Sequence, residues 1–326
     1  AQSTNFFALS RLRAPLMMLI EPISAPVPSL GVRVATGKPC IASPGPSCTK
    51  LIDTMVSPRA AQLFEPLEPI MAREPLEDPA DIFPGLMEGM KVGGAQVAIP
   101  MRHASSGLHY NAEIFAERGI DRAPRTIEEV FDFARRCTYR RADGTPVVGL
   151  LMPGVTYPNV IDLARAWDGD FITPDFRVVA DQPPMLNAIR ALRELWQAGA
   201  FPRNFASIQS EDVNTWVQQG RAAMALNSMG RNRIYNDPAR SRFPGKIITI
   251  AVPASESMRG RFEVAPAKVE FWGMVIPRNA RRKDLSWSFI RHLSAKPATL
   301  AMALNGNGPV RNSTYEDARV REALPY

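Results

Sequence analysis

Carboxylates next to aromatic residues are the side chains of this sequence best suited to chemistry. Glu270 precedes Phe271 and Trp272 in an apolar run, and Asp168 follows Trp167 in the loop AWDGDF. A pair of carboxylates on either side of a sugar can hydrolyse a glycosidic bond. Aromatic rings and polar side chains also bind sugars without any reaction, through C–H surfaces and hydroxyl groups. These residue types therefore leave a glycoside-active enzyme and a sugar-binding protein both open.

Motifs for other reaction classes are absent from the sequence. There is no Gly-x-Ser-x-Gly elbow, no P-loop and no Gly-x-Gly-x-x-Gly pattern. The segment NGNGP at 305–309 is not followed by a helix start, so it does not form the usual phosphate cradle. The acidic pairs at 128–129 and 211–212 lie near expected helix starts, where the helix dipole accounts for them. We therefore expect a protein that is not an enzyme and uses no cofactor.

Metal-ligating residues are few and badly spaced. The chain has three cysteines and three histidines, and their spacings match no zinc template. The odd number of cysteines also argues against a disulfide framework. We expect no metal site.

The charge of the chain is basic but dispersed. The net charge is +7, with Lys and Arg scattered along the sequence, and no helix-turn-helix, RNP or zinc-finger spacing accompanies them. We expect a generally basic surface and no nucleic-acid partner. No run reaches the roughly 18 apolar residues of a membrane helix.

The elements that would position these residues begin near Leu51. Helices are predicted at 57–67, 111–118, 126–137, 184–199 and 284–294, from caps and apolar stripes. Short apolar strands are predicted at 95–100, 222–228, 246–253 and 271–277. Helices alternating with short strands indicate an α/β fold. Residues 1–50 contain seven prolines, five bases and one acid, and no regular period, so we assign them no fold.

Four segments give the chain a family resemblance. They are GLHYNAEIFAERGIDRAPRTIEEVFDFARR at 107–136, VQQGRAAMALNSMGR at 217–231, FWGMVIPRNARRKDLSWSFIRHLS at 271–294 and NGNGPVRNSTYED at 305–317. In this order and at these spacings they resemble the family 1 extracellular solute-binding proteins of carbohydrate ABC transporters. The resemblance runs from about residue 51 to 317.

The resemblance implies a type II periplasmic-binding-protein-like fold, with two α/β lobes joined by hinge strands. It assigns 51–155 mostly to lobe 1, 156–265 mostly to lobe 2, and 266–326 to crossover and hinge elements with a lobe 2 helix; 1–50 stays an atypical segment. The family's opening strand–helix–strand and its last helices have no counterpart here, so we expect a fold shortened at both ends.

The resemblance also implies a set of ligand-binding residues in the cleft between the lobes. The set is Asp53, Thr54, His103, Trp167, Asp168, Asn227, Ser228, Arg231, Glu270, Trp272 and Arg311. Structural roles compete with these assignments: a helix cap for Asp53, a partly buried loop position for Trp167 and a salt bridge for Arg311. We expect Asn227, Trp272 and Arg311 to face one shared hollow.

The function implied is capture of a sugar, a polyol or a related small polar solute for an ABC importer. The expected partners are that solute and the permease subunits of the transporter. The expected state is a monomer in the periplasm or outside the cell, although no clear signal peptide is visible. The alternatives are a glycoside hydrolase using Glu270 with Asp168 and, less favoured, a basic nucleic-acid-binding protein.

Overall fold

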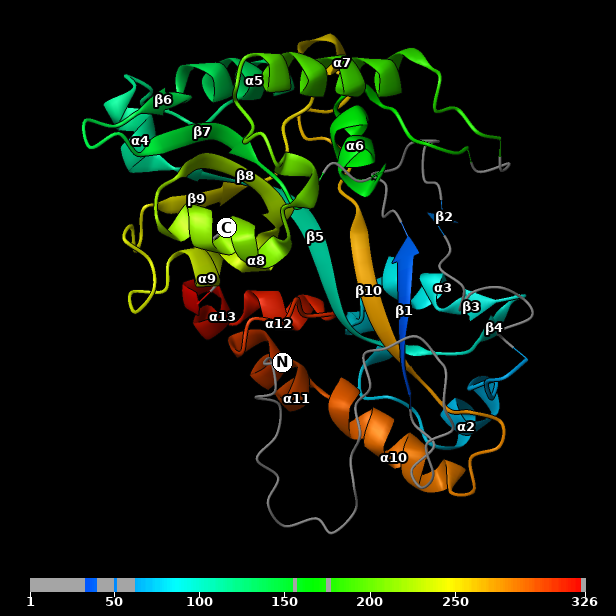
Figure 1. Ribbon diagram of the computed structural model, residues 1–326. Helices are drawn as coiled ribbons and strands as arrows, with labels where there is room; N and C mark the ends of the chain where they lie inside the picture. The colour runs from blue at the N-terminus through cyan, green and yellow to red at the C-terminus, as the bar shows by residue number, and fades with distance from the viewer. Residues whose placement is uncertain (1–32, 40–49, 52–61, 155–156, 174–176, 324–326) are drawn as a thin grey trace.

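A computed structural model describes residues 33–39, 50–51, 62–154, 157–173 and 177–323 (Figure 1). Most of residues 1–50, together with Asp53 and Thr54, lies outside the described part. The helix predicted over 57–67 is described only from residue 62, and 62–67 form turns and a bridge instead of a helix.

One mixed sheet of eight strands organises the chain, in the order β2-β1-β10-β5-β8-β7-β6, with β9 also paired to β5. A separate hairpin pairs β3 with β4. The strands are β1 (Arg33–Pro39), β2 (Lys50–Leu51), β3 (Lys91–Val92), β4 (Ala95–Gln96), β5 (Ile99–Asn111), β6 (Tyr139–Arg140), β7 (Pro146–Leu151), β8 (Ala222–Ser228), β9 (Ile247–Ile250) and β10 (Val269–Val275).

Helices cover the two ends of this sheet, with α5 and α7 over one end and α10 over the other (Figure 1). The α-helices are α2 (Glu68–Arg73), α3 (Pro84–Gly89), α4 (Ala112–Glu117), α5 (Ile127–Arg136), α6 (Tyr157–Ala164), α7 (Pro183–Gln197), α8 (Ser210–Gln218), α9 (Asn232–Tyr235), α10 (Lys283–Ser294), α11 (Lys296–Leu304), α12 (Asn312–Glu316) and α13 (Ala318–Ala323). The short 3-10 turns are η2 (Pro79–Asp81), η3 (Arg165–Trp167), η4 (Phe205–Ser207), η5 (Met229–Arg231) and η6 (Glu256–Met258).

Strand β5 shows where the molecule divides. Its first three and last five residues are buried, whereas residues 102–106 between them are partly exposed. A strand that is buried at both ends and partly exposed to solvent in its middle passes from one hydrophobic core to another. Strand β10 runs antiparallel beside it over this stretch, so the two strands form a hinge ribbon (Figure 1).

The hydrophobic clusters confirm two cores on either side of the ribbon. One core, here called lobe 1, gathers residues from 64–101 and 269–310 and includes Leu86, Ile99 and Phe271. The other, lobe 2, gathers residues from 108–265 and includes Leu108 and Phe115. Each core is assembled from its own helices packed on its own part of the sheet.

The predicted lobe boundaries are corrected by these clusters. The chain passes into lobe 2 within β5, well before residue 155, because α4, α5 and β7 pack with α7 in one core. Helix α10 belongs to lobe 1 and not to lobe 2, because Trp287 and Ile290 pack against Leu67 and Ile99. The apolar stripes identified these helices, but a stripe does not say which core it joins.

Local signals explain the elements that the sequence predicted well. Helix α5 begins after Thr126, whose side chain accepts a hydrogen bond from the Glu129 backbone N–H at 3.2 Å. The Asn111 side chain caps α4 in the same way, and Gly119 beyond its end has a positive φ of 67°. Gly220 has φ of 64° at the turn between α8 and β8.

The buried face of helix α7 differs from the apolar stripe predicted for residues 184–199. Met185, Ala188 and Leu195 are among its buried residues, whereas Ile189 and Trp196 are exposed. Because the helix covers its core with a narrow face, these two positions lie outside it, and Trp196 is not a core residue.

Candidate ligand-binding site

Polar and aromatic side chains form a row on one face of the hinge ribbon. We call this row the hinge strip: Arg102, Ala104 and Ser106 from β5, and Lys268, Glu270 and Trp272 from β10 and the residue before it. Trp272 lies opposite Arg102 and Glu270 opposite Ala104 in the antiparallel register. Because side chains alternate along a strand, these residues share one face.

Arg102 and Trp272 form the lobe 1 end of the strip. The guanidinium carbon of Arg102 lies 3.8 Å from the centroid of the Trp272 ring, a cation–π contact. Its Nη1 donates to Asn307 Oδ1 at 3.1 Å. Burial lowers the pKa of Arg102, and the nearby Glu270 carboxylate opposes that effect. The pair presents a partly desolvated cation on an aromatic plane.

A charged cluster forms the lobe 2 end of the strip. Lys268 Nζ lies 3.1 Å from Glu270 Oε1 and 3.9 Å from Asp162 Oδ2. The Ser106 hydroxyl donates to Asp162 Oδ2 at 2.6 Å. Asp162 belongs to α6 and is 3% exposed, and burial raises the pKa of its carboxyl group. The cluster therefore ties a lobe 2 helix to the hinge ribbon.

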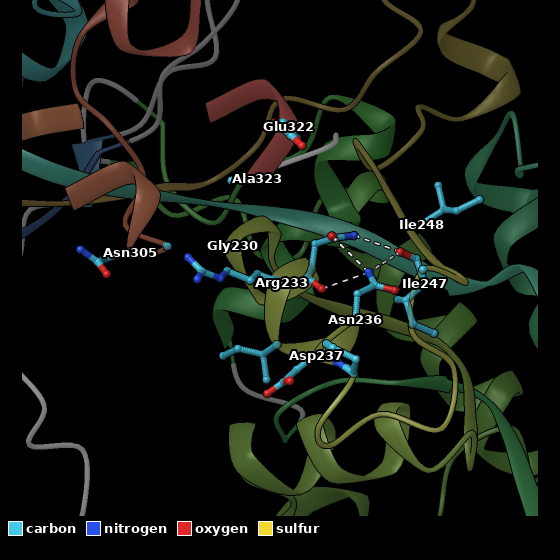
Figure 2. Close-up of a pocket in the computed structure, with 14 residues that line it drawn as sticks. Gly230, Arg233, Asn236, Asp237, Ile247, Ile248, Asn305, Glu322 and Ala323 are labelled. Carbon is cyan, nitrogen blue, oxygen red and sulfur yellow. Dashed lines mark hydrogen bonds between the residues drawn. The ribbon is translucent and has the colours of Figure 1, made fainter. Parts of the chain in front are cut away.

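A separate hollow of about 860 Å³ lies where lobe 2 meets the C-terminal helices (Figure 2). Its lining is Gly230, Asn232, Arg233, Ile234, Asn236, Asp237, Pro238, Gly245, Ile247, Ile248, Asn305, Gly306, Glu322 and Ala323. Arg233 donates from Nη1 to the Leu304 carbonyl at the end of α11, so this contact joins the two sides.

The amide side chains of this hollow are already bonded within the protein. Asn236 Nδ2 donates to the Ile247 carbonyl at 2.8 Å, as the dashed lines in Figure 2 show. Asn232 Nδ2 donates to Thr249 Oγ1 at 2.7 Å and to the same Ile247 carbonyl at 3.0 Å. These groups hold the wall together and leave few donors for a solute.

Three of the predicted ligand residues lie on or beside the hinge strip. Glu270 and Trp272 are strip members and are partly exposed. Ser228 ends β8 directly opposite Ser106. The structure thus brings part of the predicted set together at the ribbon.

Three further predicted residues are engaged elsewhere. His103 alternates to the other face of β5, where its ring lies between Phe83 and Tyr315 and its Nε2 is 3.3 Å from the Tyr315 hydroxyl. The Asn227 amide donates to the Tyr235 hydroxyl at 3.1 Å. Arg231 Nη1 lies 3.3 Å from a Glu211 carboxylate oxygen.

Trp167 and Asp168 sit in lobe 2 packing. The Trp167 ring stacks on Phe131, with centroids 6.3 Å apart, and joins the lobe 2 core. Asp168 has a left-handed backbone with φ of 61°, and its carboxylate pairs with Arg261 at 2.8 Å. Trp167 therefore occupies a partly buried loop position, which is the structural alternative to ligand binding.

Arg311 is fully enclosed by the protein. Its side chain has no exposed surface, and it donates to the carbonyls of Ser294, Asp78 and Glu77. Nη1 also lies 3.2 Å from Asp81 Oδ2. The salt-bridge alternative therefore holds, and Arg311 leaves the candidate set.

The three residues expected to face one hollow, Asn227, Trp272 and Arg311, make their contacts in three different places. Asn227 turns to α9, Trp272 lies on the hinge strip and Arg311 is enclosed in lobe 1. The residues that sequence reasoning missed are Arg102, Lys268 and Asp162. Polar or small residues at every second position from 102 to 106 are the signal that could have found the strip face.

Among the described residues, no group of three His, Cys, Asp or Glu side chains is arranged to hold a metal ion. No helix in that part of the chain is long and apolar enough to cross a membrane.

Comparison with known proteins places this geometry in a family. A family model described as bacterial extracellular solute-binding protein matches residues 51–299. A probable ABC transporter-binding protein from Deinococcus radiodurans is 22% identical over 255 residues, which cover 75% of this chain and 58% of that protein. The chain thus spans less than two thirds of the length of this relative.

Solved structures share the fold. The maltose-bound MalE3 of T. maritima matches with a TM-score of 0.71 and 23% identity, over 81% of this chain and 66% of that one. A solute-binding protein from Agrobacterium radiobacter K84 in complex with ribitol matches with a TM-score of 0.71 and 20% identity, over 90% and 70%. The fold is the two-lobed α/β fold of type II sugar-binding proteins. The chain belongs to the bacterial extracellular solute-binding protein family.

Proposed function

We propose that this protein captures a sugar or polyol at the hinge strip and delivers it to the permease of an ABC importer. The family match and the ABC transporter-binding relative support the transport role. Maltose, mannitol and ribitol are bound by proteins of the same fold, which supports this class of solute. The protein acts outside the cytoplasmic membrane as a monomer, and it does not transform its solute.

The observation that carries the proposal is the partly exposed middle of β5 between two separate cores. Closing the lobes about this ribbon would bury a solute against the strip. Trp272 offers an aromatic surface for C–H groups, and Glu270 and Ser106 offer oxygen atoms to hydroxyl groups. The second hollow is less suited, because its lining contains no aromatic ring that could pack on a sugar.

Catalysis by Glu270 with Asp168 gains no support. Glu270 is paired with Lys268 at 3.1 Å, and Asp168 with Arg261 at 2.8 Å. Each carboxylate therefore pairs with a cation of its own, on a different part of the molecule.

Thermal denaturation against a panel of maltose, D-mannitol, ribitol and D-tagatose tests the proposal. A solute at 100 times its Kd adds about 2.7 kcal/mol to the free energy of unfolding, so at least one panel member should raise Tm. Trp272→Ala should cut the rise to about half or less at the same solute concentration. Trp216→Ala is the matched control, since Trp216 is also stacked by an arginine (Arg221, 4.1 Å) but lies away from the strip.

A folded protein whose Tm responds to no panel member would contradict the proposal. A response that survives in Trp272→Ala and disappears in Trp216→Ala would move the site away from the hinge strip.

A further inference from the structure

Arg102 is a partly buried arginine on the hinge strip. Among the described residues, the two buried arginines each have a carboxylate: Arg165 lies 3.0 Å from Asp170, and Arg311 lies 3.2 Å from Asp81. No carboxylate in the described part of the chain lies within ion-pair distance of Arg102, although its side chain is half-buried. Nearby Glu270 is bonded to Lys268 at 3.1 Å.

The guanidinium is also short of hydrogen-bond acceptors. It carries five N–H donors. Its hydrogen bond in the described structure is the one from Nη1 to Asn307 Oδ1 at 3.1 Å. None of its other donors is enclosed without a partner, so these donors face solvent and can bond an acceptor from outside the chain.

The orientation of Arg102 is fixed before any solute arrives. Stacking on the Trp272 ring at 3.8 Å and the bond to Asn307 hold the guanidinium plane from two sides. A planar guanidinium in a fixed position can donate two parallel hydrogen bonds to two oxygens of a carboxylate or phosphate group. The Trp272 face toward Arg102 is covered, so a solute meets the cation there instead of the ring.

The remainder of the strip fits a hydroxylated body joined to that anionic group. Ala104 contributes only a methyl group between Arg102 and Ser106, which are four residues and hence about 13 Å apart along the strand. Beyond it, Ser106, Glu270 and Lys268 provide acceptors and donors for hydroxyl groups. The cation therefore lies at one end of a polar strip that is long enough for a sugar or an open-chain polyol.

We propose that Arg102 binds an anionic group of the solute, a carboxylate or a phosphate, so that the protein takes an acidic or phosphorylated sugar or polyol in preference to the neutral compound. This inference rests on the proposed function, because it names the solute class of the same strip.

Calorimetric titration with two matched pairs tests it: ribitol against ribitol 5-phosphate, and D-glucose against D-glucuronate. At constant ionic strength, the anionic member of at least one pair should bind 10- to 100-fold more tightly, as expected for charge-assisted hydrogen bonds. The pair that responds distinguishes phosphate from carboxylate. Inorganic phosphate alone should bind far more weakly, because it lacks the hydroxylated body.

Arg102→Gln should remove the difference within the responding pair, and Arg102→Lys should restore only part of it, since an ammonium lacks the fork. Arg221→Gln is the control, because Arg221 is likewise stacked on a tryptophan, at 4.1 Å, and should leave the preference intact. Melting curves of each variant without solute confirm folding.

Neutral solutes that bind as tightly as their anionic partners, or a preference that persists in Arg102→Gln, would overturn the inference and leave the proposed function standing. A folded protein that binds neither member of either pair, nor any sugar or polyol of the neutral panel, would overturn both.

Discussion

Replacing Arg311 with alanine separates a structural role from a ligand-binding role for this side chain. The guanidinium is fully enclosed and joins three segments of lobe 1. Nε donates to the Ser294 carbonyl at 2.8 Å, Nη1 to the Asp78 carbonyl at 2.8 Å and Nη2 to the Glu77 carbonyl at 2.6 Å. Nη1 also contacts the Asp81 carboxylate at 3.2 Å. The variant would leave all four acceptors without this donor.

The cost follows from these partners. Removing one member of a buried ion pair typically costs 3–5 kcal/mol, because the other charge remains enclosed. Burial raises the pKa of Asp81, but hydrogen bonds from Ser313 and Arg311 outweigh it and hold the pKa below its ordinary value. Because Ser313 would still bond to this carboxylate, we expect the lower end of the range, about 3 kcal/mol.

Urea unfolding followed by circular dichroism measures this loss as a fall in the free energy of unfolding. Arg319→Ala is the control, since Arg319 pairs with Asp317 on the surface, where solvent screens the pair, and should leave stability nearly unchanged. The reasoning is refuted if Arg311→Ala costs less than about 1 kcal/mol, or if it weakens solute binding while stability is unchanged.

Three further predictions concern the scaffold. Gly149→Ala should destabilise the protein by several kcal/mol, because the added Cβ would lie 1.7 Å from the Ala134 carbonyl oxygen, whereas Gly230→Ala meets nothing within 3.5 Å and should be nearly neutral; urea unfolding compares them. Burial lowers the pKa of His109 from 6.5 to about 4. As the pH falls, the His109 imidazole is protonated in the unfolded chain near pH 6.5 but in the folded protein only near pH 4. The folded state should therefore lose about 3 kcal/mol of stability between pH 6.5 and pH 4. In His109→Asn the free energy of unfolding should depend less steeply on pH over this range. Thr126→Ala should cost about 1 kcal/mol through loss of the α5 cap, and an unchanged denaturation midpoint would count against that role.

The sequence predicted the elements whose signals are local. Thr126 at the start of α5, Gly119 after α4 and Gly220 before β8 act within a few residues, so their positions can be read from neighbours in the chain. The family resemblance likewise held, because it depends on the order of such elements, and the family model matches residues 51–299, which contain three of the four segments.

The lobe assignment and much of the site could not be predicted in this way. Which core α10 joins depends on long-range packing of Trp287 with Leu67. Arg311 follows a loop pattern that suggested a ligand, but three carbonyls distant in sequence enclose it. Arg102 and Lys268 became candidates only once the register of β5 against β10 placed them on one face.

Isothermal titration of the intact protein with its best solute, beside Trp272→Ala, tests the central claim most directly. The account predicts one solute bound per chain and an affinity at least tenfold weaker in the variant, as expected when a buried aromatic contact is removed. Equal affinity in Trp272→Ala, with both proteins folded, would show that the hinge strip is not where the solute binds.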